Sequence, residues 1–250
     1  MTIDVDRGLL TQAHELLAER VGHGHSEDTQ RPETVQAMQI ALHVPKANPP
    51  ERTSLLEAAA RAVVSVCLDG RAVTDADWRT GLTDWYDHLI RKIARRGRNK
   101  QWEDVQRLPG VTVEVNGACA RAFVPSPVED VPRDLGKLQI KGTELEKDPR
   151  STAPVDPAIA LIALNADLDM STGKAAAQVG HGSMLLAAAM DRGEIQAWAR
   201  TGFELQVREL PAEEFRELAA REDAVIVRDA GFTEVAPDSV TVVALRPATA

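Results

Sequence analysis

The chain has 250 residues, of which 44% are hydrophobic and 27% are charged, so it is long enough for one large or two modest globular domains. Its formal charge of −9 argues against a general nucleic-acid coat protein, because phosphate binding requires clustered cations. The first residues include Asp4 and Glu15, unlike a signal peptide, and no apolar run approaches the roughly 18 residues of a membrane span, so we expect a cytoplasmic protein that does not contact membranes.

The N-terminal segment, residues 1–32, is predicted to be a short helix followed by a flexible arm. Residues 9–21 have helical apolar spacing, and the polar, glycine-containing run 22–33 interrupts it. His23 and His25 lie in that run, where a mobile loop and a metal site are both open interpretations. No Cys or carboxylate set at ligand spacing accompanies the two histidines, and we expect no bound metal.

A first α/β domain is predicted for residues 33–141. Its expected elements are strand 38–44, helix 53–68, a second helix from Asp77, strand 111–115 and strand 120–124. Asn116-Gly117 is a strong signal for a hairpin between the last two strands. Cys67 and Cys119 fall within these elements and are expected to be core residues, and so few cysteines suit a reducing compartment.

A basic cluster follows the second predicted helix. Six cations and no anion occur within ten residues: Arg91, Lys92, Arg95, Arg96, Arg98 and Lys100. We expect the cluster to continue the helix as a basic stripe, with Trp102 close enough to offer a base-stacking face. A nucleic-acid contact and a solvated face with Trp102 in the core are both open interpretations.

Residues 142–156 are rich in charge and contain two prolines, which predicts a linker to a second domain at residues 157–250. The expected elements there are strand 159–164, helix 173–190, strand 203–207, helix 213–220, strand 224–227 and strand 240–245. This order predicts an α/β fold with a mixed sheet and helices on its faces. Both halves begin strand, helix, helix, strand, so a degenerate duplication is an open alternative, although no residue motif repeats.

Polar residues of two kinds stand out in the second domain. Lys174, Gln178 and His181 lie at positions i, i+4 and i+7, so they share one face of the long helix. Alone, this pattern is more typical of a solvated amphipathic face. Asp229 directly follows a buried strand, a position where reactive groups commonly sit on a rigid scaffold. The combination makes these residues a candidate site.

These residues carry a resemblance to a known family. The string Gly173-Lys174-Ala175-Ala176-Ala177-Gln178 with His181, followed by Arg228-Asp229-Ala230-Gly231, Thr233, Ala236-Pro237 and Thr241, resembles the type 2 peptidyl-tRNA hydrolases over about residues 155–248. The resemblance implies a four-stranded mixed sheet, often in a homodimer, and an enzyme that hydrolyses the ester of peptidyl-tRNA without a cofactor. It implies active-site positions at Lys174, Gln178, His181, Asp229, Thr233 and Thr241.

The roles expected at this site follow from the needs of ester hydrolysis, an activated water and a stabilised oxyanion. Asp229 would orient or deprotonate water, and Lys174 or Thr233 would face the developing negative charge. Gln178 would orient the substrate and His181 would support the base. Substrate contacts are assigned to Thr241, Ser239, Arg91, Arg95 and Arg96.

The sequence also departs from the family pattern. Asp238 and Ser239 stand where Gly-Thr is expected, and Gly180 and Gly182 flank His181 where the family usually has Ser and Ala. Ser239 retains a hydroxyl, whereas an added carboxylate at Asp238 repels a phosphate-bearing substrate unless it faces away. A non-catalytic member that only binds tRNA or a protein is therefore the alternative function.

Overall fold

The computed structural model describes residues 6–21, 30–31, 34–151, 153–231 and 234–248. Within these stretches, no helix has the length and apolar character needed to cross a membrane. His23 and His25 lie outside the described residues.

The N-terminal half is an α/β unit built on one mixed sheet. Its strands are β1 (Gln36–His43), β2 (Arg91–Gly97), β3 (Gly110–Val115), β4 (Ala118–Phe123) and β5 (Ser126–Pro127). Its helices are α2 (Arg52–Cys67), α3 (Arg71–Thr74), α4 (Ala76–Tyr86), α5 (Asn99–Val105) and α6 (Arg133–Gly136). The main strand order is β2-β1-β4-β3, with β1 parallel to β2 and antiparallel to β4. Asn116 and Gly117 have positive φ and turn the chain between β3 and β4, as the hairpin signal predicts.

The basic cluster forms a strand, so its prediction as the continuation of a helix is wrong. Helix α4 ends at Tyr86, and residues 91–97 form β2, which pairs in parallel with β1 from Ala37↔Arg91 to His43↔Gly97. Because β1 is buried, its backbone groups need ladder partners, and this tertiary requirement outweighs the local helical spacing. Side chains on a strand alternate between faces, so the cations do not form a single stripe.

The C-terminal half contains the predicted four-stranded mixed sheet. Its strands are β6 (Ala160–Asn165), β7 (Leu205–Leu210), β8 (Val225–Arg228) and β9 (Val240–Leu245). Its helices are the 3₁₀ turn η2 (Ala166–Leu168), α7 (Thr172–Ala189), α8 (Arg192–Arg200) and α9 (Ala212–Ala219). The strand order is β7-β6-β9-β8, with β6 parallel to β7 and antiparallel to β9.

The two halves have the same topology. In each, the first strand lies between the second and the fourth, the first pair is parallel, and the remaining pairs are antiparallel. Each half also runs from its first strand into a long helix, α2 or α7, and reaches its second strand after a further helix, α4 or α8. The shared order is what a degenerate duplication would produce, although residue motifs do not repeat.

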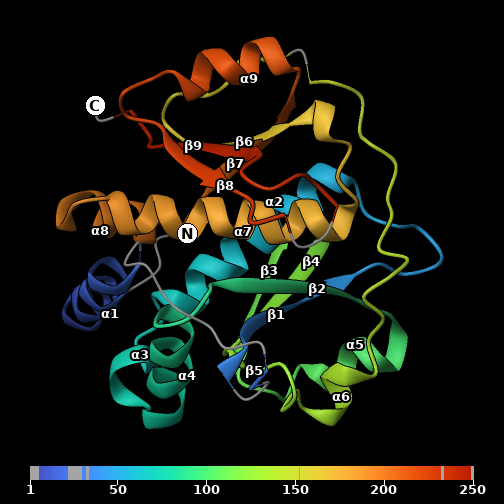
Figure 1. Cartoon of the computed structure of the whole chain (residues 1–250), viewed down its shortest axis with the longest axis vertical. Coiled ribbons are helices and arrows are strands. Elements are labelled where there is room, and N and C mark those ends of the chain that lie inside the picture. Colours follow the sequence, from blue (N-terminus) through green and yellow to red (C-terminus); the bar gives the residue numbers. More distant parts are fainter. Residues whose placement is uncertain (1–5, 22–29, 32–33, 152, 232–233, 249–250) are drawn as a thin grey trace.

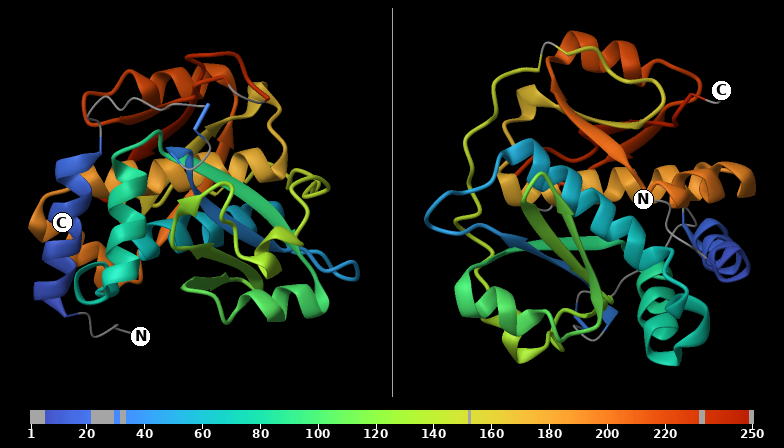
Figure 2. Two further views of the ribbon diagram at one scale, coloured as in Figure 1. Left: turned by 60° about the horizontal axis from the view of Figure 1, so that its bottom comes forward. Right: turned by 180° about the vertical axis from the view of Figure 1, so that it is seen from behind.

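The long helices α2 and α7 lie between the two sheets, which face each other across them (Figure 1). Residues of both sheets and both helices form one continuous hydrophobic cluster. Helix α9 covers the outer face of the C-terminal sheet through Phe215, and α5 and α6 lie on the outer side of the N-terminal sheet (Figure 2). The core therefore joins the halves into one packed body.

The first helix, α1 (Arg7–Arg20), and residues 142–156 join the two halves further. The α1 helix packs on α7 and α8, with His14 Nε2 2.9 Å from the Ala187 carbonyl oxygen. The described residues between 142 and 156 form no helix or strand, yet Thr143 is only 1% exposed. Thr143 Oγ1 accepts from the Gly173 N–H, and Glu144 accepts from the Thr172 N–H, so the connecting segment caps the first turn of α7.

Candidate active site

Two side chains from distant parts of the C-terminal half meet as an ion pair. Lys174 Nζ lies 2.5 Å from Asp229 Oδ2, and the side chains of Lys174 and Asp229 are 11% and 8% exposed. Gln178 Nε2 donates to the same carboxylate oxygen at 2.7 Å, and the Gly231 N–H donates to the other at 2.8 Å. Three donors thus fix the carboxylate in one orientation.

Thr241 completes this cluster and determines how the Gln178 amide is turned. Its hydroxyl donates to Gln178 Oε1 at 2.6 Å, so the amide nitrogen must face Asp229. A β-bulge explains how Thr241 faces α7: Val227 pairs with Val242 and Arg228 with Val240, leaving Thr241 as the extra residue. Lys174, Gln178, Asp229 and Thr241 are the candidate catalytic residues of this chain, and we refer to them together as the catalytic cluster.

Local structure positions both sides of the cluster. Ser171 is the N-cap of α7, accepts from the Lys174 N–H at 3.1 Å, and donates its hydroxyl to Glu234 Oε1 at 2.6 Å. Glu234 belongs to the loop after β8, so this contact joins that loop to the start of α7. Gly231 has φ 78°, and a Cβ there would lie 2.5 Å from the Pro237 ring, so the loop requires glycine.

The departures at positions 238 and 239 lie in the turn that closes the loop. The Asp229 N–H donates to the Ser239 carbonyl oxygen, and the Asp238 N–H donates to the Asp229 carbonyl oxygen. Asp238 is exposed and has φ 62°, a conformation that favours the glycine expected there. Ser239 donates its hydroxyl to the Ala236 carbonyl oxygen at 2.7 Å, so this hydroxyl closes the turn. Thr233 lies outside the described residues.

His181 is positioned by the other half of the chain. Its Nδ1 lies 3.0 Å from Nζ of Lys92, which extends from β2. Burial lowers the pKa of His181 well below its ordinary value of 6.5, and the charges of Lys92 and Lys174 lower that pKa further. His181 is therefore neutral at physiological pH, and its ring nitrogens differ in role.

The arginines assigned to substrate binding do not form a helical stripe beside the cluster. Arg95 donates to Gln39 Oε1 at 2.7 Å, and Arg96 donates to the Gly142 carbonyl oxygen at 2.7 Å. Both contacts lie within residues 33–142, and Arg91 is half-buried at the start of the same edge strand. Trp102 stacks on His43, with ring centroids 4.8 Å apart, and is half-buried.

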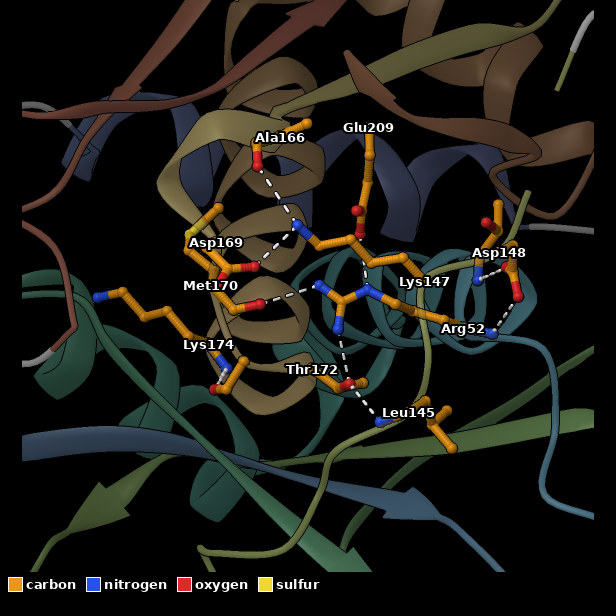
Figure 3. A network of polar contacts seen from close by, with 12 residues as sticks. Arg52, Leu145, Lys147, Asp148, Ala166, Asp169, Met170, Thr172, Lys174 and Glu209 are labelled. Carbon is orange, nitrogen blue, oxygen red and sulfur yellow. Dashed lines mark hydrogen bonds and ion pairs between the residues drawn. The ribbon is translucent and has the colours of Figure 1, made fainter. Parts of the chain in front are cut away.

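Sequence reasoning did not find the residues that secure the start of α7. Arg52, buried at the start of α2, donates to Thr172 Oγ1 at 2.6 Å, to the Met170 carbonyl oxygen and to Glu209 (Figure 3). These contacts join residues more than a hundred positions apart, and an arginine at a helix start carries no local signal for them. The sequence likewise offers no sign that Lys92 contacts His181, because Lys92 resembles its basic neighbours in the same segment.

Two further features lie away from the cluster. A cavity of about 670 Å³ lies between residues 147–155 and the β7–α9 segment, and its lining includes Arg150 and Glu214. Across the described stretches, no group of three His, Cys, Asp or Glu side chains is placed to bind a metal ion.

The comparisons with known proteins fall on the same half as the cluster. The model of the family described as Peptidyl-tRNA hydrolase PTH2 matches residues 159–250. A peptidyl-tRNA hydrolase of Methanopyrus kandleri is 36% identical over 95 residues, which covers 82% of that protein and 35% of this chain. This chain belongs to the PTH2 family of peptidyl-tRNA hydrolases. The PTH2 region begins at the first strand of the C-terminal half, so it contains all four residues of the catalytic cluster.

Proposed function

We propose that this chain hydrolyses the ester bond of peptidyl-tRNA, releasing peptide and tRNA to translation in the cytoplasm. The observation that carries the proposal is the Lys174–Asp229 pair, 2.5 Å apart, within the region that matches the PTH2 family. The name of the Methanopyrus kandleri relative supports the same chemistry. The Gln178–Thr241 contact keeps a third polar side chain directed at the pair.

The chemistry follows from the charges of the pair. Asp229 accepts a proton from a water molecule as the water oxygen attacks the ester carbonyl carbon. The π electrons of the carbonyl move to the carbonyl oxygen. Lys174 then faces the oxyanion, and such preorganised donors are worth about 3–4 kcal/mol. When the intermediate collapses, the C–O bond to the terminal ribose breaks, and the ribose oxygen takes up the proton. No cofactor is required for these steps.

The other predicted site residues have supporting roles in this proposal. Gln178, fixed by Thr241, orients the substrate ester, and neutral His181 serves as a hydrogen-bond partner or supporting base. Ser239 belongs to the loop after β8, and we propose that Ser239 and Thr233 contact the acceptor end of the tRNA. Two such chains are proposed to form a homodimer through a surface other than the internal α2–α7 contact, and light scattering would then give twice the 27.1 kDa mass.

Arg91, Arg95 and Arg96 of the edge strand β2 are proposed tRNA contacts, with Arg96 on the opposite face of the strand from Arg91 and Arg95. Each phosphate neutralised by a cation releases counterions, so charge reversal at Arg91 should weaken tRNA binding and flatten its salt dependence. Affinity that is unchanged across a salt titration would remove Arg91 from the tRNA surface.

The test incubates the full chain with N-acetylaminoacyl-tRNA. Aminoacyl-tRNA, in which the α-amino group is not acylated, is the comparison substrate. A hydrolase releases the acylated amino acid with turnover, whereas a non-catalytic binder shifts the RNA in a gel and releases none. Lys174→Met should abolish release, and Lys147→Met is the matched control because its ion pair with Asp169 is exposed. Gel shift without release by the wild-type chain would refute the proposed function.

A further inference from the structure

The contact between the two long helices is reciprocal. A Cβ on Gly180 of α7 would lie 2.9 Å from Val63 of α2, while Ser183 of α7 donates to the Ala60 carbonyl oxygen of α2 at 2.7 Å. Counted from the N-caps Glu51 and Ser171, position 60 corresponds to position 180, and 63 to 183. The 63–180 contact therefore has its counterpart in the 60–183 contact. Such reciprocal contacts between equivalent positions occur across a two-fold dimer interface.

The N-terminal half has uncharged residues where the C-terminal half has its catalytic cluster. By the same count, Ser54 occupies the position of Lys174, and Ala58 that of Gln178. Asn116 follows β3 as Asp229 follows β8, and its Nδ2 lies 3.3 Å from Ser54 Oγ. The uncharged Ser54–Asn116 pair therefore occupies the place of the charged Lys174–Asp229 pair. The two-residue turn 116–117 stands where the C-terminal half has residues 229–239.

Lys92 of the N-terminal half reaches into the other half without a carboxylate partner among its described contacts. Its side chain is buried, with Nζ 3.0 Å from His181 Nδ1, 3.8 Å from Met184 Sδ and 4.7 Å from the ring centroid of Trp85. Lysine is rarely buried without an acid, because desolvating the ammonium costs free energy. Lys92 is buried at His181, beside the catalytic cluster, despite this cost, which indicates that Lys92 has a role at that histidine.

We propose that the N-terminal half is a non-catalytic second copy of the hydrolase fold that serves as a built-in partner subunit, and that its Lys92 is a positioning residue for His181. This proposal rests on the proposed function. Lys92 donates to Nδ1, which leaves the ring proton on Nε2. His181 then presents a fixed N–H donor to the substrate, and the catalytic half is incomplete without the other.

The electrostatic surroundings agree with this role. Burial lowers the pKa of Lys92 to about 7. The titratable groups that face Lys92 are Cys67 of α2 and His181 of α7. Tyr86 of α4 interacts with Cys67, and the charge of Lys174 also acts on His181. Burial raises the pKa of the Cys67 thiol to about 11 and that of Tyr86 well above 10, so both stay neutral around pH 7. Lys92 is thus the group in this set that titrates near neutrality.

The first experiment measures the His181 tautomer directly by ¹⁵N NMR of the full chain labelled in histidine. The wild-type spectrum should show Nδ1 unprotonated and Nε2 protonated at pH 6, with the Nδ1 shift changing as Lys92 titrates. Lys92→Met should give a mixture of the two tautomers. A wild-type His181 with Nδ1 protonated would overturn the proposal without any variant.

The second experiment measures turnover. Lys92→Met should lower kcat at least about tenfold, part of the roughly 10²–10⁴-fold that a positioned acid–base group supplies, with KM unchanged. Lys137→Met, at an exposed lysine outside the basic cluster, is the control. Unchanged kcat in Lys92→Met would refute the positioning role. If the wild-type chain releases no peptide, the proposed function fails, but the NMR experiment still decides the Lys92–His181 contact.

The non-catalytic copy is tested by removing its remaining polar pair. The double variant Ser54→Ala with Asn116→Ala should keep kcat within about twofold of wild type, because these residues contact each other in the other half. A loss of turnover comparable to that of Lys174→Met, in a variant with an unchanged unfolding transition, would show a working second site.

Discussion

Replacing Asp229 with Asn is the most informative single change at the catalytic cluster. The substitution keeps the shape of the side chain but removes the charge that pairs with Lys174. Asp229 also accepts from Gln178 and from the Gly231 N–H, on different oxygens. An amide has one oxygen and one NH₂, so in either orientation at least one donor faces another donor.

The size of the effect follows from burial. Breaking a buried ion pair by removing one partner costs about 3–5 kcal/mol, because it leaves the other charge buried without compensation. The Lys174 side chain is 11% exposed, so we expect Asp229→Asn to lose about 3 kcal/mol of unfolding free energy. Loss of the proposed general base should also lower kcat by about 10²–10⁴-fold.

Urea unfolding and release of N-acetylamino acid from tRNA measure these two effects. Glu214→Gln is the matched control, since it makes the same carboxylate-to-amide change in the exposed Arg150–Glu214 pair and should cost no more than about 1 kcal/mol. The reasoning would be refuted if Asp229→Asn matched Glu214→Gln in stability and retained wild-type turnover.

Further changes probe the surroundings of the cluster. Thr241→Val leaves the buried Gln178 Oε1 without its donor, so it should cost about 1–3 kcal/mol of unfolding free energy and lower kcat. A variant as stable as the wild type in a urea titration would contradict the Thr241–Gln178 contact. Gly180→Ala brings a Cβ to 2.9 Å from Val63 and should destabilise by about 1–3 kcal/mol in the same assay, whereas Gly136→Ala meets nothing within 4 Å and should not. Lys92 titrates at about 7 when folded and near 10.5 when unfolded, so between pH 7 and 8.5 the unfolded chain binds more protons. Stability should therefore rise with pH by up to about 1.4 kcal/mol per unit, and Lys92→Met should flatten that slope.

The sequence allowed the C-terminal half to be predicted closely, because its strands are apolar or alternating runs and its polar residues recur in the order of a known family. Strand 240–245 was predicted with its observed bounds. Lys174 and Gln178 lie one helical turn apart, so local geometry alone places them together. Their meeting with Asp229 required the family resemblance, since no local rule brings positions 174 and 229 together.

The remaining features depend on tertiary packing that no local pattern records. Residues 91–97 became a strand because buried β1 required a ladder partner, and Lys92 became a core residue with them. Gly180 departs from the family because Val63 lies against it, and Gly182 because Val242 Cγ1 would lie 2.8 Å from a Cβ there. Both departures are explained by neighbours distant in the chain.

The central claim is that Lys174 and Asp229 act as one catalytic unit. A double-mutant cycle on kcat for peptidyl-tRNA hydrolysis tests it most directly, with Lys174→Met, Asp229→Asn and the combined variant measured at saturating substrate. We predict that the combined variant is no slower than the slower single variant. Losses that multiply, as they do for independent residues, would contradict the account.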